Sequence, residues 1–246
     1  MTRVALAAVT ALVLTGCATA QITVPPTDVA DLERNLRGDS RFLRVSMHVT
    51  PFYGDQTRKL LTPVDPELVR YLNDASGKPL NPGPVEATFP AGTPVRIMKA
   101  EFPSGWTMAE RVLYTPRSLV WVYVDVAGRP TNAPPAVLVM RPGIKTADEF
   151  NTELERLLTR QDPALRLEGF SDAVRTAVKA KKAVKDMPSE ALEMAWGYPE
   201  NKRIEMIDSQ RHETWYWGDK AREAKLVDGR LVSFSGANAA SSSSSP

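Results

Sequence analysis

The sequence is poor in the residues that build most catalytic and metal sites. Its 246 residues include one cysteine, Cys17, and two histidines, His48 and His212. A lone cysteine cannot form an intramolecular disulfide, and one Cys with two His cannot complete a typical zinc site. The chain also lacks a Gly-x-Ser-x-Gly elbow and a phosphate-binding glycine-rich loop. We therefore expect no enzyme activity, no metal and no cofactor, and we interpret both histidines as surface residues.

A strong charge of one sign is missing too. The formal net charge is +2, from 31 basic and 29 acidic residues, which gives no reason to expect a nucleic-acid partner. The chain is 43% hydrophobic and 24% charged, as is usual for globular proteins. Beyond the N-terminal stretch there is no apolar run of about 20 residues, the length that a membrane-spanning helix needs.

The N-terminus has the layout of a secretory signal. Arg3 precedes an apolar stretch, residues 4–14, which only Thr10 interrupts and which is too short to span a membrane. Leu14-Thr15-Gly16-Cys17 resembles the bacterial lipobox, in which a diacylglycerol is attached to the Cys thiol and the signal peptidase cuts before it. The alternative is an ordinary signal peptide with a chance cysteine, but a lone thiol is a liability in an oxidising compartment.

The lipobox resemblance implies how the chain is held in the cell. Residues 1–16 would be the signal peptide and residues 17–27 a lipidated linker that begins at Cys17. Several acyl chains are needed for stable anchoring, and this modification supplies them. Position 18 is Ala, whereas Asp there retains well-studied Gram-negative lipoproteins in the inner membrane. The resemblance therefore implies a lipid-anchored outer-membrane protein that faces the periplasm.

Residues 28–160 are expected to form a β-rich domain with flanking helices. Thr27 is a candidate cap for a short helix, and residues 41–49 alternate apolar and polar side chains like one half-buried strand. Residues 65–72 begin with Asp65 and Pro66, which predicts a second short helix. Further expected elements are a loop at 73–94 and strands at 94–100, 118–126 and 136–140. This pattern favours a small twisted sheet or an SH3-like barrel.

A helical period begins at residue 146. Thr146 and Glu149 form a capping-box pattern, and the apolar residues after it repeat at helical spacing to about Arg160. The domain boundary is expected between residues 160 and 171. Ser171 should cap a helix whose basic residues face water, and we interpret them as a solvated face in preference to a lipid-binding patch. These basic residues are Arg175, Lys179, Lys181 and Lys182.

The rest of the chain is expected to form a small α/β domain over residues 171–235. Pro188 should start a two-turn helix that Gly197 ends. Strands are expected at residues 202–208, 213–217 and 225–234, with a tight turn at Asp228-Gly229 in the last of them. The final residues, 236–246, are rich in Ser and are predicted to be disordered.

This C-terminal pattern resembles the BamE/SmpA-type outer-membrane lipoproteins. The family carries Gly-Met-Ser/Thr-x-x-Glu/Gln-Val, Leu-Gly-x-Pro, Trp-x-Tyr/Phe and a strand ending in Asp-Gly. The matching segments here are Met187 with Glu190, Trp196-Gly197-Tyr198-Pro199, Trp215-Tyr216-Trp217 and Asp228-Gly229-Arg230-Leu231-Val232. Asp186 and Pro188 depart from the pattern. The resemblance implies an ααβββ domain over about a quarter of the chain, and therefore an α+β protein overall.

Trp215, Tyr216 and Trp217 are the candidate protein-interaction residues, because Trp and Tyr are enriched at binding hot spots. The alternative is that both tryptophans pack in the core against the Trp196 helix. Three functions remain open. The first is a non-catalytic envelope adaptor with a protein partner, and the second is a cell-wall or small-ligand binding module that uses the N-terminal sheet. The third is a hydrolase, or its inhibitor, with a site built from distant carboxylates.

Overall fold

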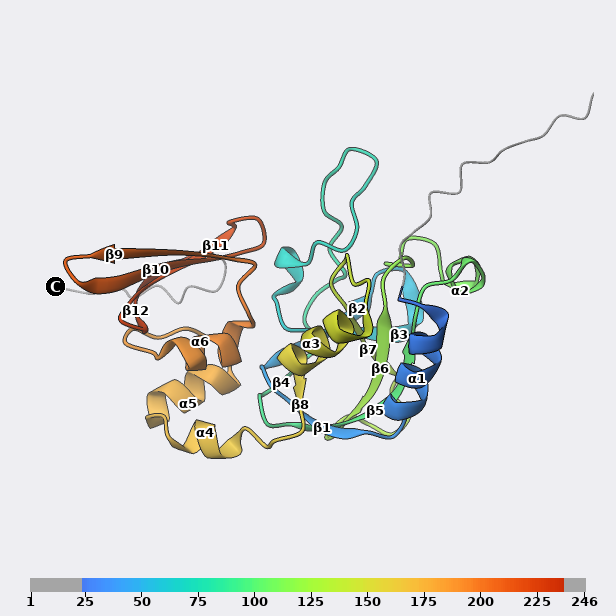
Figure 1. Cartoon of the computed structure of the whole chain (residues 1–246), viewed down its shortest axis with the longest axis horizontal. Coiled ribbons are helices and arrows are strands. Elements are labelled where there is room, and N and C mark those ends of the chain that lie inside the picture. Colours follow the sequence, from blue (N-terminus) through green and yellow to red (C-terminus); the bar gives the residue numbers. More distant parts are fainter. Residues whose placement is uncertain (1–23, 237–246) are drawn as a thin grey trace, which may run out of the picture.

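Two β-sheets with helices packed against them make up the computed structural model, which describes residues 24–236 (Figure 1). This arrangement confirms the predicted α+β class. Cys17 and the expected signal segment lie outside the described residues, as does the Ser-rich tail after Gly236. The elements up to residue 159 are termed the N-terminal unit, and those from residue 164 the C-terminal unit.

The N-terminal unit contains an eight-stranded sheet in the order β4-β2-β3-β7-β6-β5-β1-β8. Neighbouring strands are antiparallel except β3 and β7, which pair in parallel. In chain order the elements are α1 (Pro26–Leu36), β1 (Ser40–Leu43), β2 (Met47–Phe52), β3 (Asp55–Thr62), the 3₁₀ helix η1 (Pro66–Leu68), β4 (Ala87–Phe89), β5 (Pro94–Glu101), α2 (Gly105–Glu110), β6 (Trp121–Val126), β7 (Ala136–Val139), α3 (Ala147–Leu157) and β8 (Leu158–Thr159).

The single strand expected at residues 41–49 is divided into β1 and β2. Between them, the Arg44 backbone N–H donates to the Leu157 carbonyl and the Ser46 N–H donates to Met194, so both groups leave the sheet ladder. Only residues 44–46 separate β1 from β2, yet four strands lie between them in the sheet order. The sheet must therefore curl until these two strands meet.

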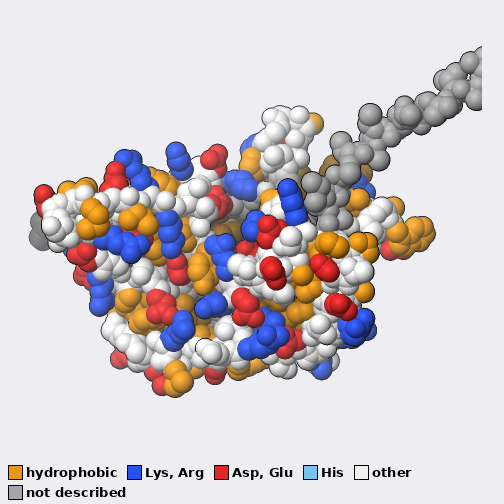
Figure 2. All heavy atoms as spheres, viewed as in Figure 1, with side chains coloured by type: hydrophobic (Ala, Val, Ile, Leu, Met, Phe, Trp, Pro, Cys, Tyr) orange, Lys and Arg blue, Asp and Glu red, His pale blue; other side chains and the backbone are white. Residues whose placement is uncertain are grey.

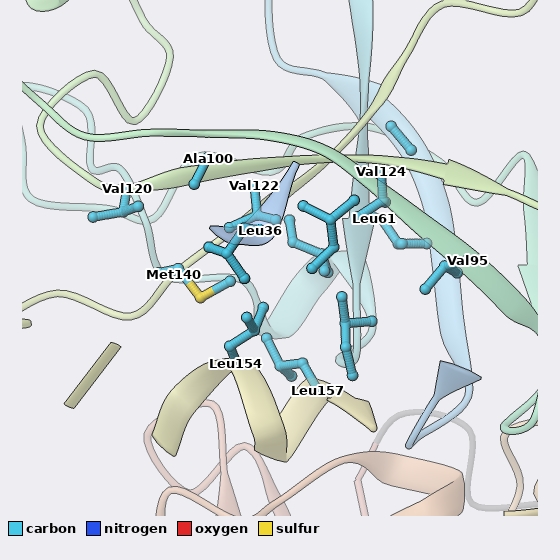
Figure 3. Packing of buried hydrophobic residues seen from close by; sticks show 14 of the residues in the cluster. Leu36, Leu61, Val95, Ala100, Val120, Val122, Val124, Met140, Leu154 and Leu157 are labelled. Carbon is cyan, nitrogen blue, oxygen red and sulfur yellow. The ribbon is translucent and has the colours of Figure 1, made fainter. Parts of the chain in front are cut away.

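The helices α1 and α3 cover one face of the curled sheet. Leu36 from α1 and Leu154 and Leu157 from α3 point toward Val122 and Val124 of β6 (Figure 3). Each of these leucines is at most 7% exposed, and burying such a side chain contributes roughly 1.5–3 kcal/mol. The opposite face has its own smaller cluster, which includes Trp121.

The N-terminal caps of α1 and α3 differ from the predicted ones. Helix α1 starts at Pro26 with Pro25 as its N-cap, so Thr27 is not the cap that we expected. A proline at the first position already has the helical φ. The Thr146 hydroxyl does accept from the Glu149 N–H, but the Glu149 carboxylate accepts from Lys145 instead of closing the box. The helix expected at residues 65–72 is only the three-residue η1, and the loop expected at 73–94 contains β4. Strands β3 and β8 and helices α2 and α4 (Ala164–Glu168) were not predicted.

The C-terminal unit has a four-stranded antiparallel sheet in the order β12-β11-β10-β9. Its elements are α4 (Ala164–Glu168), α5 (Asp172–Lys179), α6 (Ser189–Trp196), β9 (Asn201–Ile207), β10 (Gln210–Trp217), β11 (Arg222–Val227) and β12 (Arg230–Ser235). The turn at Asp228-Gly229 divides the last expected strand into β11 and β12. Helices α5 and α6 lie against one face of this sheet (Figure 1).

The two units share a core. Leu68 and Ala91 of the N-terminal unit belong to the same apolar cluster as Trp196 and Trp217. A Cβ at Gly197 would lie 3.3 Å from the Pro63 carbonyl oxygen, and Gly197 also has φ of +80°. Glycine at the end of α6 thus permits both the turn and the close approach of the N-terminal unit.

Candidate functional site at the junction of the two units

Charged side chains are buried where the two units meet. Ser46, Asp65, Lys181 and Arg222, termed the junction cluster, are 0%, 2%, 4% and 1% exposed. The first two come from the N-terminal unit and the last two from the C-terminal unit. Buried charges are costly unless they are paired and hydrogen-bonded, so the partners of each group decide what the cluster does.

Lys181 was expected on a solvated helix face and is buried instead. Helix α5 ends at Lys179, and Lys181 then adopts a left-handed φ of +53°, which takes it off the helix. Its ammonium donates to three backbone carbonyls, at 2.8 Å from Ser46 O, 2.7 Å from Pro63 O and 2.8 Å from Ala195 O. All three donors are therefore used, and they join both units.

Ser46 extends the same joint. Its hydroxyl donates to the Val178 carbonyl at 2.7 Å and accepts from the Ala91 N–H at 3.0 Å. Its own N–H donates to Met194. Ser46 lies between β1 and β2, and it bonds to α5 through its hydroxyl and to α6 through its backbone N–H. In a regular strand this N–H would bond to a neighbouring strand.

Asp65 was expected to begin a helix, but no side-chain cap forms at η1. Its carboxylate binds Arg222 instead and accepts a 3.0 Å hydrogen bond from His48 Nε2. The guanidinium of Arg222 also lies 4.5 Å from the centre of the Trp196 ring, a cation–π distance. His48 is only 8% exposed, so its interpretation as a surface histidine is wrong.

The surroundings shift the pKa values of Asp65 and Lys181. Burial alone raises the pKa of Asp65, but hydrogen bonds and nearby positive charge outweigh it and hold this pKa well below its usual range. Burial lowers the pKa of Lys181 to about 7; Asp65 opposes this shift and Arg222 adds to it. Asp65 is therefore ionised at neutral pH, and its charge favours the ammonium form of Lys181.

Thr88, His48 and Asp65 lie in the order of a hydroxyl–imidazole–carboxylate triad. The Thr88 hydroxyl is 2.9 Å from His48 Nδ1, and Thr88 is exposed on β4. In a triad the acid stabilises the imidazolium that forms during the reaction. Here Arg222 already neutralises the Asp65 carboxylate. The arrangement therefore holds β4, β2 and the C-terminal unit together and is poorly suited to activate Thr88.

A small cleft lies on another side of the junction. Its volume is about 270 Å³, below the roughly 300–1,000 Å³ of drug-sized ligand sites. Both units line it: Arg44, Val45, Thr159, Gln161, Asp162, Pro163, Arg166, Glu190, Glu193, Met194 and Tyr198.

The carboxylates of this cleft are already engaged. Glu190 pairs with Arg166 and Glu193 with Lys202, both at 2.8 Å. Asp162 accepts from the backbone N–H of residue 164 at 2.8 Å. The acids therefore have partners within the protein, which gives no support to the hydrolase hypothesis.

The predicted interaction residues lie in the core. Trp215 and Trp217 are 2% and 0% exposed and pack toward Trp196, so the expectation that they form a recognition surface is wrong. Alternation along β10 places Tyr216 on the opposite face, where it is half-buried. His212 is half-exposed on the same strand.

Strand β9 has the exposed apolar surface that the tryptophans lack. It is an edge strand whose seven residues are all exposed, with Ile204 at 51%, Met206 at 67% and Ile207 at 48%. Ile204 is opposite Glu213, and Met206 is opposite Arg211. They therefore share the face of the sheet that carries Trp215, at a place that the helices leave uncovered. In the sequence, the run Ile-Glu-Met-Ile at residues 204–207 was the only indication of this apolar surface.

Comparison of the chain with known families, characterised proteins and solved structures finds no match. Between residues 24 and 236, no helix is both long enough and apolar enough to cross a bilayer. In the same part of the chain, no three His, Cys, Asp or Glu residues gather into a group that could bind a metal ion.

Proposed function

We propose that the chain is a lipid-anchored lipoprotein of the bacterial outer membrane that acts as a non-catalytic adaptor in the periplasm. Cys17 carries the lipid, and a protein partner binds the C-terminal unit. The observation that carries the adaptor role is that Lys181 and Asp65 of the junction cluster are buried and bonded to other parts of the protein. Lys181 directs its three donors to backbone carbonyls, and Asp65 is bound by Arg222 and His48.

A buried and bonded cluster suits a scaffold better than an enzyme. A catalytic lysine or a general base must reach its substrate, but Lys181 and Asp65 are 4% and 2% exposed and contact protein groups. Their hydrogen bonds instead hold the two units in one relative orientation. A rigid body of this kind presents its surfaces in a fixed arrangement relative to one another, which is what an adaptor requires.

The partner surface of this proposal is the outer edge of β9, with which no strand of the described part of the chain pairs. An unpaired edge strand is a template for another strand, and Ile204 and Met206 offer apolar contacts beside it. The BamE-like reading of this domain belongs to the same proposal. Its support is the order of helices α5 and α6 followed by antiparallel strands, although the sheet has four strands instead of three.

Site-specific photo-crosslinking tests the adaptor role. A photoreactive phenylalanine analogue at Met206, which is 67% exposed, should give one reproducible adduct with an envelope protein in intact cells. The same analogue at Leu165 of α4, which is 78% exposed, is the matched control and should not give that adduct. Ile204→Lys should abolish the Met206 adduct. Identical adducts from both positions, or none from β9, would contradict the proposal.

A second candidate is a cell-wall or small-ligand binding module, which the sequence associated with an SH3-like N-terminal sheet. The curled sheet supports that reading in part, while the parallel β3–β7 pair and the packed helices depart from the expected small barrel. The cleft favours this function because it presents Arg44 to an anionic group and Tyr198 to an apolar one. Co-sedimentation with purified peptidoglycan tests it, and Arg44→Ala should abolish the binding.

A further inference from the structure

One loop of the N-terminal unit exposes large apolar side chains that no residue between 24 and 236 covers. Residues 104–114, termed the α2 loop, include Trp106 at 74%, Leu113 at 57% and Tyr114 at 69% exposure, with Val112 at 41%. Figure 2 shows hydrophobic side chains gathered at the end of the molecule where α2 projects in Figure 1. Single exposed apolar residues are ordinary, but a gathered set marks an interaction surface.

The α2 loop is a built structure with a firm base. Arg111, only 5% exposed, donates to the carbonyls of Arg117, Leu119 and Glu101 and pairs with the Glu101 carboxylate. Its guanidinium lies 3.8 Å from the centre of the Trp121 ring. The apolar side chains at the tip are therefore held outward from a buried, fully bonded base.

The backbone of the loop supports the same reading. Tyr114 has φ of +67°, a conformation that costs a bulky residue free energy and is retained where the surroundings demand it. Ser104 and Thr107 close a capping box at the start of α2. These two features fix Trp106 and Tyr114 at the two ends of the exposed segment.

The α2 loop lies beside the place where the described chain begins. Val24 is 3% exposed and lines one hollow together with Phe102 and Pro103, which directly precede the loop. Residues 18–23 separate Val24 from Cys17, and a fully extended chain of that length spans roughly 25 Å at most. A lipid on Cys17 therefore keeps this end of the protein close to the membrane surface.

We infer that the α2 loop is a second membrane contact, in which Trp106, Leu113 and Tyr114 enter the headgroup region of the leaflet that holds the Cys17 lipid. The inference rests on the proposed lipidation. Trp and Tyr prefer this region because their rings are apolar and carry one polar group. Glu110 is the one acidic residue of the loop, and it must stay in the headgroup water. Two contacts fix the orientation of the protein, which a single point of attachment would not do.

Tryptophan fluorescence tests this contact, because Trp106 differs from the other four tryptophans. Those four, Trp121, Trp196, Trp215 and Trp217, are at most 2% exposed. The mature lipidated protein is reconstituted into vesicles of phosphatidylethanolamine and phosphatidylglycerol with brominated acyl chains. The emission of Trp106 should shift to shorter wavelength and be quenched by bromine. Trp106→Phe should lose the quenchable emission and keep the thermal stability of the parent.

A matched pair of variants and a flotation assay separate the membrane contact of the α2 loop from the lipidation of Cys17. Leu113→Lys should reduce the bromine quenching of Trp106, whereas Leu165→Lys on α4 should leave it unchanged. A protein that fails to float with the vesicles overturns the lipidation, and the inference with it. A protein that floats, but whose Trp106 is quenched by aqueous iodide and not by bromine, overturns the membrane contact alone.

Discussion

Replacing Lys181 with methionine removes the ammonium that joins the two units and keeps a side chain of similar length. Three buried carbonyls, those of Ser46, Pro63 and Ala195, then lose their donor. Each unsatisfied buried acceptor costs about 1–3 kcal/mol, and removing a buried charge returns part of that cost. We expect Lys181→Met to lower the free energy of unfolding by about 3 kcal/mol.

Urea unfolding followed by far-UV circular dichroism measures this loss. Lys182→Met is the matched control, since Lys182 is the next residue along the chain and is exposed; it should stay within about 0.5 kcal/mol of the parent. Loss of the joint should also broaden or split the transition, because the two units would no longer unfold together. A Lys181→Met protein as stable as the Lys182→Met protein would refute the structural role of the ammonium.

Three further outcomes follow from the junction. The pKa of Lys181 in the folded protein is about 7, below its ordinary 10.5, so the folded state releases this proton at lower pH than the unfolded state does. Between pH 7 and 10.5 the parent protein should therefore become more stable relative to Lys181→Met, by at most about 1.4 kcal/mol per pH unit. Urea unfolding at a series of pH values measures this difference. Asp65→Asn should cost about 3 kcal/mol at neutral pH because it removes the carboxylate charge that pairs with buried Arg222. Since folding lowers the pKa of Asp65, this difference should shrink below about pH 4, as acid titrations of both proteins would show. Gly197→Ala should lower the melting temperature by the equivalent of 1 kcal/mol or more, given its positive φ and the nearby Pro63 carbonyl; an unchanged melting temperature would count against the close packing of the units.

Local patterns in the sequence predicted a helix or strand well where that element buries one face in a single hydrophobic core. The repeat of apolar residues in α3 and the Ser171 cap of α5 are both present. Alternation correctly placed Trp215 and Trp217 on one face of β10. These features depend on neighbours within a few residues, which the sequence shows directly.

The junction cluster could not be predicted because it depends on contacts between distant segments. Ser46 and His48 occupy the polar positions of an alternating strand. Both are buried, because the C-terminal unit contacts Ser46 and because β4 pairs with β2 beside His48. Lys181 follows the helical period of α5, but the helix ends two residues before it. The partner of Asp65 is 157 residues away. No local period carries this information.

The same limit applies to the two surfaces that carry the proposals. The apolar residues of the α2 loop and of β9 look like core residues in the sequence, and only the fold shows that they are exposed. Their value as binding surfaces depends on where the chain is tethered, which the lipobox resemblance supplies and the described residues do not include. The membrane anchor is therefore the claim on which the rest depends.

The mass of the mature N-terminal peptide, taken from protein purified out of bacterial membranes, tests that claim most directly. We expect a chain that begins at Cys17 and carries a diacylglycerol on its thiol, with a further acyl chain where the host adds one. An unmodified Cys17, or a mature chain that begins at any other residue, would rule out the lipid anchor.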